Sequence, residues 1–400
     1  NQPGDPFPSK YLAGVGVAFY VMLALRARLR ESGWFGLRGI AEPNLAQYLD
    51  LVALGTVADV VPLDRNNRIL VQQGLLRIRA GQCVPGISAL LKAGNRNPQS
   101  IVADDLGFAV GPRLNAAGRL DDMSLGIECL LTDDETAARE MAQQLDALNR
   151  DRKDIETEMQ AQALVTLREL DLGDDDLPTG LCLFDPQWHQ GVIGILAARI
   201  KERFHRPVIA FARSQDGEIK GSARSVPGLH IRDMLGAVAT RYPGMIGKFG
   251  GHAMAAGLTL AEPDFDAFSR AFDAEVSKHL SADDLATVIW SDGQLDDGEL
   301  SLATAQVLRE AGPWGQGFPA PVFDGDFRIL GQRVVGECHL KLSLKPMDGH
   351  GRIDGIAFNT QALPSGCESA RMAYRLDVNE FRGHVTPQLI VEYIETAGDS

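Results

Sequence analysis

One long helix divides this chain into two globular parts. The segment Thr132-Asp133-Asp134-Glu135 has the form of a capping box, with acidic residues where a helix begins. From there to about Leu170, apolar residues recur at steps of three, four or seven, as in a coiled coil: Met141, Leu145, Leu148, Ile155 and Met159. A helix of this length predicts a connector between domains, and the segment Gly173 to Pro178 marks its end.

Composition sets the protein class. A chain of 400 residues is too long for one ordinary core, so two to four domains are expected. No apolar run is long enough to span a bilayer. The five cysteines are scattered without a CxxC pair, which argues against a zinc site and favours a reducing, cytosolic setting. A net charge of −14 argues against a protein that binds nucleic acid over much of its surface, but it is compatible with a local basic groove.

The part before the long helix is predicted to be one half of an α/β domain. Helices are expected at Tyr11 to Arg30, Pro43 to Leu54 and Asn66 to Ile78. Asp59 follows the second helix in an otherwise apolar run, where a carboxylate needs a compensating partner. It is either a capping or Arg-paired carboxylate, or a metal-binding or catalytic carboxylate on a shaped loop between Gly55 and Pro62.

A second candidate segment, Gly111 to Leu120, places arginines among glycines and small residues. Arg113, Asn115 and Arg119 suit contacts to phosphate, because small residues allow close backbone approach and arginine binds phosphate with two hydrogen bonds. The alternative is a helix-breaking loop in which an arginine is fixed to Asp121 or Asp122.

A βαβ unit is predicted after the long helix. Its strands are Gly180 to Asp185 and Pro207 to Ala212, its helix is Gly191 to Arg203, and a further strand spans Glu218 to Ser225. Two places in it suit phosphate. The turn with His189 and Gly191 is an anion seat or simply a helix cap. Ser222 and Arg224, after Gly221, form a phosphate site or belong to a surface edge strand.

A glycine-rich segment, Gly247 to Gly257, contains one histidine. A His held on Gly250-Gly251 can approach a substrate closely, so a functional loop with His252 is favoured over a structural His.

Short strands predominate after Val288. They are expected at 288–290, 322–329, 340–344, 353–358, 373–378 and 388–394, separated by turn residues, which suits a small OB-like barrel. Its aromatic and basic residues would stack on and hold a single strand, or would be ordinary core and surface residues: Trp314, Phe318, Arg328 and Lys341.

Together these segments resemble the RecJ family, the single-strand-specific 5′→3′ DNA exonucleases of the DHH phosphoesterase superfamily. The resemblance rests on five motifs in order: residues 55–63, 111–119, 188–194, 221–224 and 250–252. It implies a multidomain α/β fold. Its parts would be the end of a DHH domain (1–130), a connector helix (131–172), a DHHA1 domain (173–284) and an OB-like domain (285–400).

The resemblance also implies roles for single residues. Asp59 would be a ligand of two Mn²⁺ or Mg²⁺ ions, which suit carboxylate and imidazole ligands. Ser222 and Arg224 would bind the DNA 5′ phosphate, and His189 and Gly191 would belong to the same cleft. The group expected near the cleaved phosphate is Arg113, Asn115, Arg119, Gly250, Gly251 and His252.

One departure from the family pattern concerns the ligands. The Asp-x-Asp, lone Asp and Asp-His-His motifs of the superfamily are absent, and Asp59 alone cannot hold two ions. We therefore expect the C-terminal portion of an exonuclease that is inactive by itself.

Expected partners are single-stranded DNA, with a single-strand-binding protein and a helicase, and neither a membrane nor a second subunit. The alternative functions are an oligonucleotide or small-molecule phosphoesterase of this superfamily, or a non-catalytic single-strand-binding scaffold.

Overall fold

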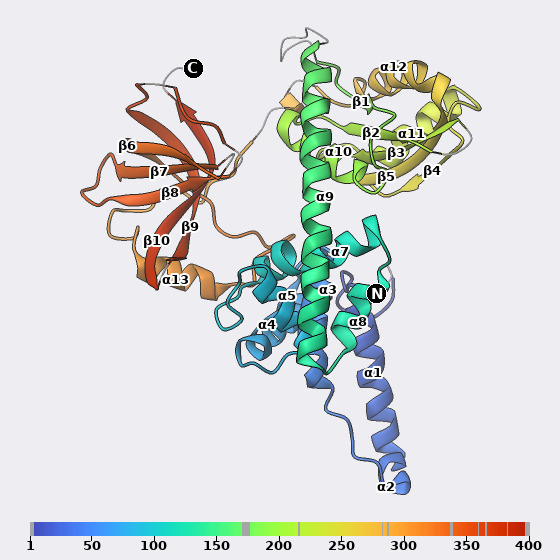
Figure 1. Cartoon of the computed structure of the whole chain (residues 1–400), viewed down its shortest axis with the longest axis vertical. Helices are drawn as coiled ribbons and strands as arrows, with labels where there is room; N and C mark the ends of the chain where they lie inside the picture. The colour runs from blue at the N-terminus through green and yellow to red at the C-terminus, as the bar shows by residue number, and fades with distance from the viewer. Residues whose placement is uncertain are drawn as a thin grey trace. The chain divides into compact units, whose positions relative to one another are not determined.

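The computed structural model describes residues 4–169, 177–214, 217–281, 283–285, 288–336, 339–358, 360–364, 366–381 and 383–396. They form two compact units (Figure 1). The first unit comprises Asn1–Pro112, Glu128–Gln143 and Ile289–Ser400, and the second comprises Arg113–Ile127 and Gln144–Val288. The predicted domain end at residues 173–176 lies outside the described residues, so the four-part division remains a prediction.

The N-terminal part of the first unit is helical. All three predicted helices are present, as α1 (Gly14–Glu31), α3 (Leu49–Ala58) and α4 (Arg65–Arg79). The prediction that the second helix ends at Leu54 was wrong, because α3 continues through Gly55 to Ala58. The remaining elements are α2 (Trp34–Arg38), η1 (Leu45–Tyr48), α5 (Pro85–Ala93), α6 (Ala103–Asp105) and the π-helix η2 (Leu106–Val110).

The same unit contains a closed five-stranded barrel, which confirms the predicted OB-like domain. Its strands follow the order β10-β8-β7-β6-β9, with β10 and β8 parallel. The segment 288–290, predicted as a strand, is irregular. Helix α13 (Leu302–Ala311) precedes the barrel and was not predicted. The strands are β6 (Phe323–Val335), β7 (His339–Pro346), β8 (Ile353–Ala357), β9 (Ser369–Phe381) and β10 (His384–Thr396).

The predicted long helix is α9 (Glu135–Glu169), preceded by α8 (Ser124–Leu131). Asp134 caps it rather than Thr132, because the Asp134 carboxylate accepts from the backbone N–H groups of Thr136 (2.7 Å) and Ala137 (3.1 Å). Its buried stripe follows alternating steps of four and three, but the middle of that stripe is polar. The buried positions are Ala138, Ala142, Leu145, Asn149, Arg152, Glu156, Met159 and Ala163.

The second unit is built on a mixed sheet of order β1-β2-β3-β5-β4, in which only β1 and β2 are parallel. The predicted β1 (Leu181–Phe184), α10 (Ile193–Phe204), β2 (Val208–Arg213) and β3 (Glu218–Arg224) are all present. They are followed by α11 (Ile231–Arg241), β4 (Lys248–Gly251), β5 (Ala255–Ala261) and α12 (Phe265–Val276).

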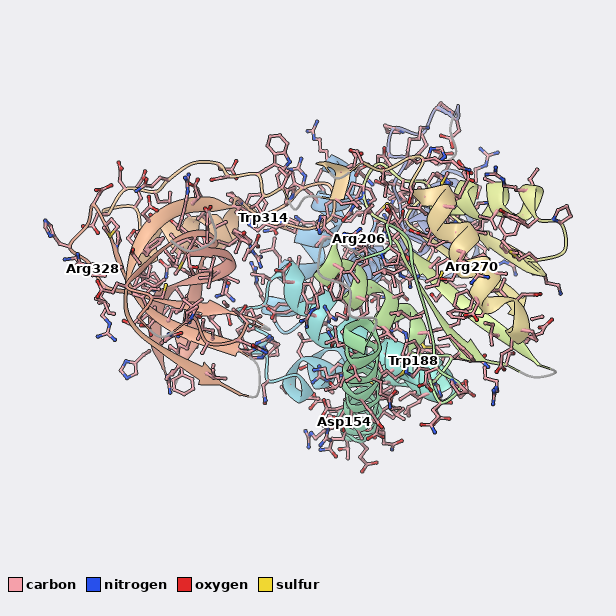
Figure 2. The ribbon with its side chains drawn as sticks, turned by 90° about the horizontal axis from the view of Figure 1, so that it is seen from above. Asp154, Trp188, Arg206, Arg270, Trp314 and Arg328 are labelled. Atoms are coloured by element: carbon pink, nitrogen blue, oxygen red, sulfur yellow. The ribbon has the colours of Figure 1, made fainter. Side chains whose placement is uncertain are left out.

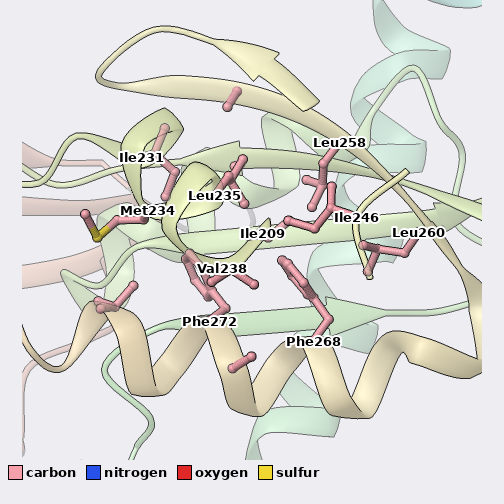
Figure 3. Packing of buried hydrophobic residues seen from close by; sticks show 14 of the residues in the cluster. Ile209, Ile231, Met234, Leu235, Val238, Ile246, Leu258, Leu260, Phe268 and Phe272 are labelled. Atoms are coloured by element: carbon pink, nitrogen blue, oxygen red, sulfur yellow. The ribbon is translucent and has the colours of Figure 1, made fainter. Parts of the chain in front are cut away.

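Two hydrophobic cores enclose this sheet. On one face, α11 and α12 bury Leu235, Phe268 and Phe272 against β2, β3 and β5 (Figure 3). On the other face, α10 and the later part of α9 bury Leu196, Ile200 and Met159 against β1 and β2. Both faces of the sheet are therefore covered by helices.

Candidate functional site

A cationic pocket lies where β3 passes the start of α10. The two-residue period of a strand places Lys220, Ser222 and Arg224 on one face of β3, while Ile219 and Ala223 point into the opposite core. The pocket has a volume of about 330 Å³. It is lined by Arg119, Gln190, Gly191, Ile193, Gly194, Ile195, Lys220, Gly221, Ser222 and Arg224.

Glycine makes the close packing of this pocket possible. A Cβ atom on Gly194, in the first turn of α10, would lie 2.9 Å from Nη2 of Arg224 and 3.0 Å from the Ser222 hydroxyl. A Cβ atom on Gly191 would lie 2.5 Å from the carbonyl oxygen of Arg119. The helix start, the arginine fork and the hydroxyl can therefore converge on one small volume, and α10 begins without a side-chain cap.

Positive charge predominates in this pocket, although Glu156 acts on Arg119 from nearby. The Arg224 guanidinium donates to the Ser222 hydroxyl (3.1 Å) and the Ala223 carbonyl (2.8 Å). Among the described residues, neither Arg119 nor Arg224 forms an ion pair with a carboxylate. Burial lowers the pKa of both guanidinium groups, and Arg152 and Arg224 lower the pKa of Arg119 further. Cations held together in this way favour an anion as ligand.

The segment Gly111 to Leu120, for which one alternative was a helix-breaking loop, forms helix α7 (Gly111–Leu120). Arg113 pairs with the carboxylate of Asp146 on α9, at 2.9 Å from Nε and 2.7 Å from Nη2, a partner that the neighbouring sequence did not suggest. At 100° per residue, Arg113 lies roughly 160° around the helix from Asn115. Asn115 and Arg119, four residues apart, share a face. The geometry therefore separates Arg113 from the other two.

His189 closes the turn before α10. Its Nδ1 accepts from the backbone N–H of Gly191 at 3.1 Å, and its carbonyl accepts from Val192 at 2.9 Å. Gly191 lines the pocket, whereas His189 does not. The His189 side chain thus stabilises the turn that leads into α10 and does not itself cap the helix, which has no side-chain cap.

The glycine-rich segment is a hairpin, not a loop. Gly250 and Gly251 end β4, and His252 follows in the turn before β5, exposed, with its N–H donating to Ala255 (2.8 Å). Gly251 has φ 146° and a Cβ atom there would lie 2.4 Å from the Ala255 carbonyl oxygen. A Cβ atom on Gly250 would meet nothing within 4 Å. The fold requires glycine at 251 but not at 250.

Asp59 is exposed, so the expectation of a buried carboxylate was wrong. It is the C-cap residue of α3, next to Val60, a β-branched residue with φ 54°. The buried carboxylate of this helix is Asp50, which accepts from the N–H groups of Leu51 and Val84 (both 2.8 Å). Left-handed backbone at a non-glycine residue is strained, and such strain concentrates at functional sites.

The predicted barrel residues have different surroundings. Trp314 and Phe318 stack on each other with ring centroids 5.0 Å apart, and the Arg68 guanidinium lies over the Phe318 ring, 3.9 Å from its centroid. This geometry favours a packing role for Phe318. Lys341 pairs with Asp354 (3.1 Å), and Arg328 is exposed on the barrel (Figure 2).

Two parts of the chain match family models. Residues 178–278 match the DHHA1 domain, and residues 291–393 match the RecJ OB domain. The exonuclease RecJ of Dickeya dadantii is 61% identical over 391 residues, which cover 97% of this chain and 68% of that protein. The RecJ of Escherichia coli is 58% identical with the same coverage. This chain belongs to the RecJ family.

A solved RecJ structure supports the membership. The crystal structure of Thermus thermophilus RecJ in complex with Mn²⁺ has a TM-score of 0.76 and 30% identity, and the match covers 98% of this chain and 54% of that one. The corresponding Mg²⁺ complex gives the same TM-score over 57% of its chain. The chain thus spans about two thirds of its Dickeya and Escherichia relatives and just over half of the solved Thermus protein.

The described residues fit a divalent ion only in part. The exposed carboxylate of Asp59 has the chemistry of an Mg²⁺ or Mn²⁺ ligand. Within the described ranges, however, no three His, Cys, Asp or Glu side chains gather as a ligand set. Asp59 can supply one ligand, and a two-ion site would need further donors. Among those same residues, no helix is long and apolar enough to cross a membrane.

The sequence analysis did not predict Lys220 as a pocket residue, the packing role of Gly194 or the burial of charged residues on α9. Lys220 could have been found from the strand period, since it precedes Ser222 and Arg224 on the same face. Arg152 donates to Glu156 (2.9 Å) and Asn149 (3.1 Å), and Glu156 also accepts from Arg199 (3.1 Å). These α9 residues occupy core positions, which their charged side chains did not suggest.

Proposed function

We propose that this chain provides the 5′-end recognition and strand-binding parts of a single-stranded-DNA-specific exonuclease that degrades DNA in the 5′→3′ direction. The observation that carries this proposal is the pocket with two guanidinium groups that lack carboxylate partners among the described residues. RecJ relatives are named as single-stranded-DNA-specific exonucleases, which agrees with an anionic, phosphate-bearing ligand.

The pocket suits a terminal phosphate better than an internal one. A 5′ phosphate carries close to two negative charges at neutral pH, whereas an internal phosphodiester carries one. The planar fork of Arg224 and the Ser222 hydroxyl would bind its oxygens, and Lys220 and Arg119 would add charge. In the first turn of α10, the N–H groups of Ile193 and Ile195 already donate to backbone carbonyls, so the N–H of Gly194, which lines the pocket, would contribute as in other helix-terminal phosphate sites.

Cleavage would then release the first nucleotide. The oxygen of a water molecule would bond to the phosphorus of the first phosphodiester, the bond to the 3′ oxygen would break, and that oxygen would take up a proton. Asn115 and Arg119, on one face of α7, would bind the non-bridging oxygens, and His252 with the Gly250-Gly251 backbone would contact the same phosphate. Two divalent ions, one held in part by Asp59, would activate the water and stabilise the leaving oxygen.

The remaining strand would lie on the OB-like barrel. Exposed cations such as Arg328 would contact its backbone without regard to sequence. A single-strand-binding protein and a helicase are proposed as partners that supply the strand, with the enzyme acting as a monomer.

The test compares the affinity of this chain for 5′-phosphorylated and 5′-hydroxyl oligonucleotides of one sequence. Losing a charge-assisted contact costs about 2 kcal/mol, so Arg224→Ala should reduce the ratio of the two affinities roughly thirtyfold. Arg224→Lys keeps the charge but not the fork, and should give an intermediate ratio.

Arg241→Ala provides the matched control. This arginine is exposed on α11 and contacts Glu275 (3.6 Å), outside the pocket, so the affinity ratio should stay unchanged. An unchanged ratio for Arg224→Ala would place the 5′-end site elsewhere.

A further inference from the structure

A second pocket lies in the first unit, beside the end of α3. It has a volume of about 460 Å³, within the range of small-molecule sites. Ala58 and Val60, on either side of Asp59 in the sequence, both line it. Its other apolar lining comes from the π-helix and from the segment before the barrel: Gly107, Phe108, Trp314, Pro319 and Val322.

Phe108 is an aromatic residue of the pocket lining whose side chain is exposed. It is 77% exposed, while its neighbours Leu106 and Val110 on the π-helix are fully buried and anchor that helix. A single exposed apolar residue is ordinary by itself. Here the ring lies on a π-helix, an element that recurs at functional sites, and lines a pocket beside the strained backbone of Val60.

The pocket lies between two places that the proposed DNA strand would contact. On one side is Asp59, proposed to lie at the cleaved phosphate. On the other side is the segment that leads into the barrel. It is bound to the loop after α3 by a hydrogen bond from the N–H of Leu63 to the carbonyl of Gln316 (2.6 Å). A strand that runs from Asp59 to the barrel would pass this pocket, since both ends belong to the same unit.

The charges in the pocket select among the groups of a DNA strand. Its charged lining residues are Asp104, Glu392 and Arg375, and the arginine pairs with Glu392 (2.6 Å) and Asp104 (3.7 Å). Two carboxylates against one guanidinium disfavour a phosphate. An uncharged base, which needs apolar walls and an aromatic face, is not disfavoured.

We propose that this pocket holds one nucleobase of the single strand, on the 3′ side of the phosphate at Asp59, with Phe108 as its stacking surface. The inference rests on the proposed function, because it takes the ligand to be single-stranded DNA. It adds a base-binding site to the phosphate contacts described above.

The experiment combines protein and DNA changes. A 5′-phosphorylated oligothymidylate is titrated with the chain while one abasic unit is moved along the strand. Removing the stacked base should weaken binding at one position by about five- to a hundredfold. Phe108→Ala should weaken binding of the intact strand equally and should abolish the sensitivity at that position, since the two changes remove one contact.

Two further variants separate stacking from packing. Phe108→Tyr keeps the ring and should bind like the unaltered chain. Leu37→Ala removes another exposed apolar side chain, 84% exposed on α2, and should change nothing. The inference is overturned if the losses from Phe108→Ala and the abasic unit add at every position, or if Phe108→Ala lowers the unfolding midpoint without changing affinity. If the unaltered chain binds no single-stranded DNA, the proposed function fails, and this inference fails with it.

Discussion

Replacing Glu156 by Gln should destabilise the second unit, because it leaves a buried arginine without its charge partner. Arg152 and Glu156 are only 7% and 8% exposed and lie 2.9 Å apart in the middle of the buried stripe of α9. Arg119 adds a further positive charge nearby: its pKa is lowered mainly by burial and additionally by Arg152. Glutamine keeps the shape of the side chain and one hydrogen-bond acceptor, but removes the carboxylate charge.

The burial of the Arg152–Glu156 pair determines how much stability Glu156→Gln should remove. Breaking a buried ion pair from one side costs about 3–5 kcal/mol, whereas exposed pairs contribute about 0–1 kcal/mol. The side chains of Arg152 and Glu156 are 9% and 11% exposed, so the larger value applies. The acceptor that glutamine retains places the expected loss near the lower end, at about 3 kcal/mol. This corresponds to roughly a hundredfold increase in the opening constant of this part of α9.

The measurement is amide hydrogen exchange of peptides from residues 144–165, compared between the variant and the unaltered chain. Glu262→Gln is the matched control, since Glu262 pairs with Arg213 on the surface of the same unit, and it should leave exchange unchanged. Changing both Arg152 and Glu156 to Met should restore most of the protection, because apolar residues of similar volume replace a buried pair at little cost.

Two outcomes would refute this reasoning. Unchanged exchange in Glu156→Gln would mean that the pair contributes no more than a surface contact. Equal losses in Glu156→Gln and in the double Met variant would mean that lost packing, not an uncompensated charge, causes the effect.

Two further predictions concern single residues of the proposed site. Gly251→Ala should lower the free energy of unfolding by more than about 1 kcal/mol. Alanine is strained at φ 146°, and its Cβ atom would lie 2.4 Å from the Ala255 carbonyl oxygen. Gly250→Ala should keep the unfolding midpoint yet weaken DNA binding, and equal midpoints for both variants in urea titrations would contradict this. Asp59→Ala should leave stability unchanged or slightly higher, since its carboxylate lies at a helix C-terminus. In an active RecJ enzyme that carries this chain, it should remove Mn²⁺-dependent cleavage, and retention of more than about a tenth of the rate would place Asp59 outside the metal site.

Regular strands were the most predictable part of the fold. In β3, the alternation of Ile219 and Ala223 with polar residues reports directly which face is buried. The five barrel strands were likewise separated by turn residues. Helix α13 was missed in the region predicted to form strands, because a ten-residue amphipathic helix is easily overlooked between two segments rich in turn residues.

A glycine and a proline explain why a loop was considered for the segment that forms α7. Gly111 and Pro112 are helix breakers in a regular α-helix, but they stand where the π-helix η2 passes directly into α7, so the helical path continues through them. The partner of Arg113 lies 33 residues away on α9, so local sequence could only offer Asp121 and Asp122. Tertiary ion pairs of this kind are not visible in the sequence near either residue.

Helix geometry explains why Asp59 is exposed although it was expected to be buried. Nine residues separate it from Asp50, which at 100° per residue turns the chain by roughly 180°. The two carboxylates therefore point to opposite sides of α3, one into the core and one into solvent. An apolar run shows that a helix is mostly buried, but only its packing partners decide which of its carboxylates is exposed.

The acidic composition and the cationic pocket are compatible because they act over different distances. A net charge of −14 repels a polyanion on average, but salt screens such repulsion beyond about 10 Å. Within the proposed site, Arg119 and Arg224 would contact a phosphate directly, and no carboxylate is among the residues that line the pocket. An acidic surface around one cationic pocket would limit non-specific binding along the strand, so that a terminal phosphate is held mainly where the helix start and the arginine fork meet.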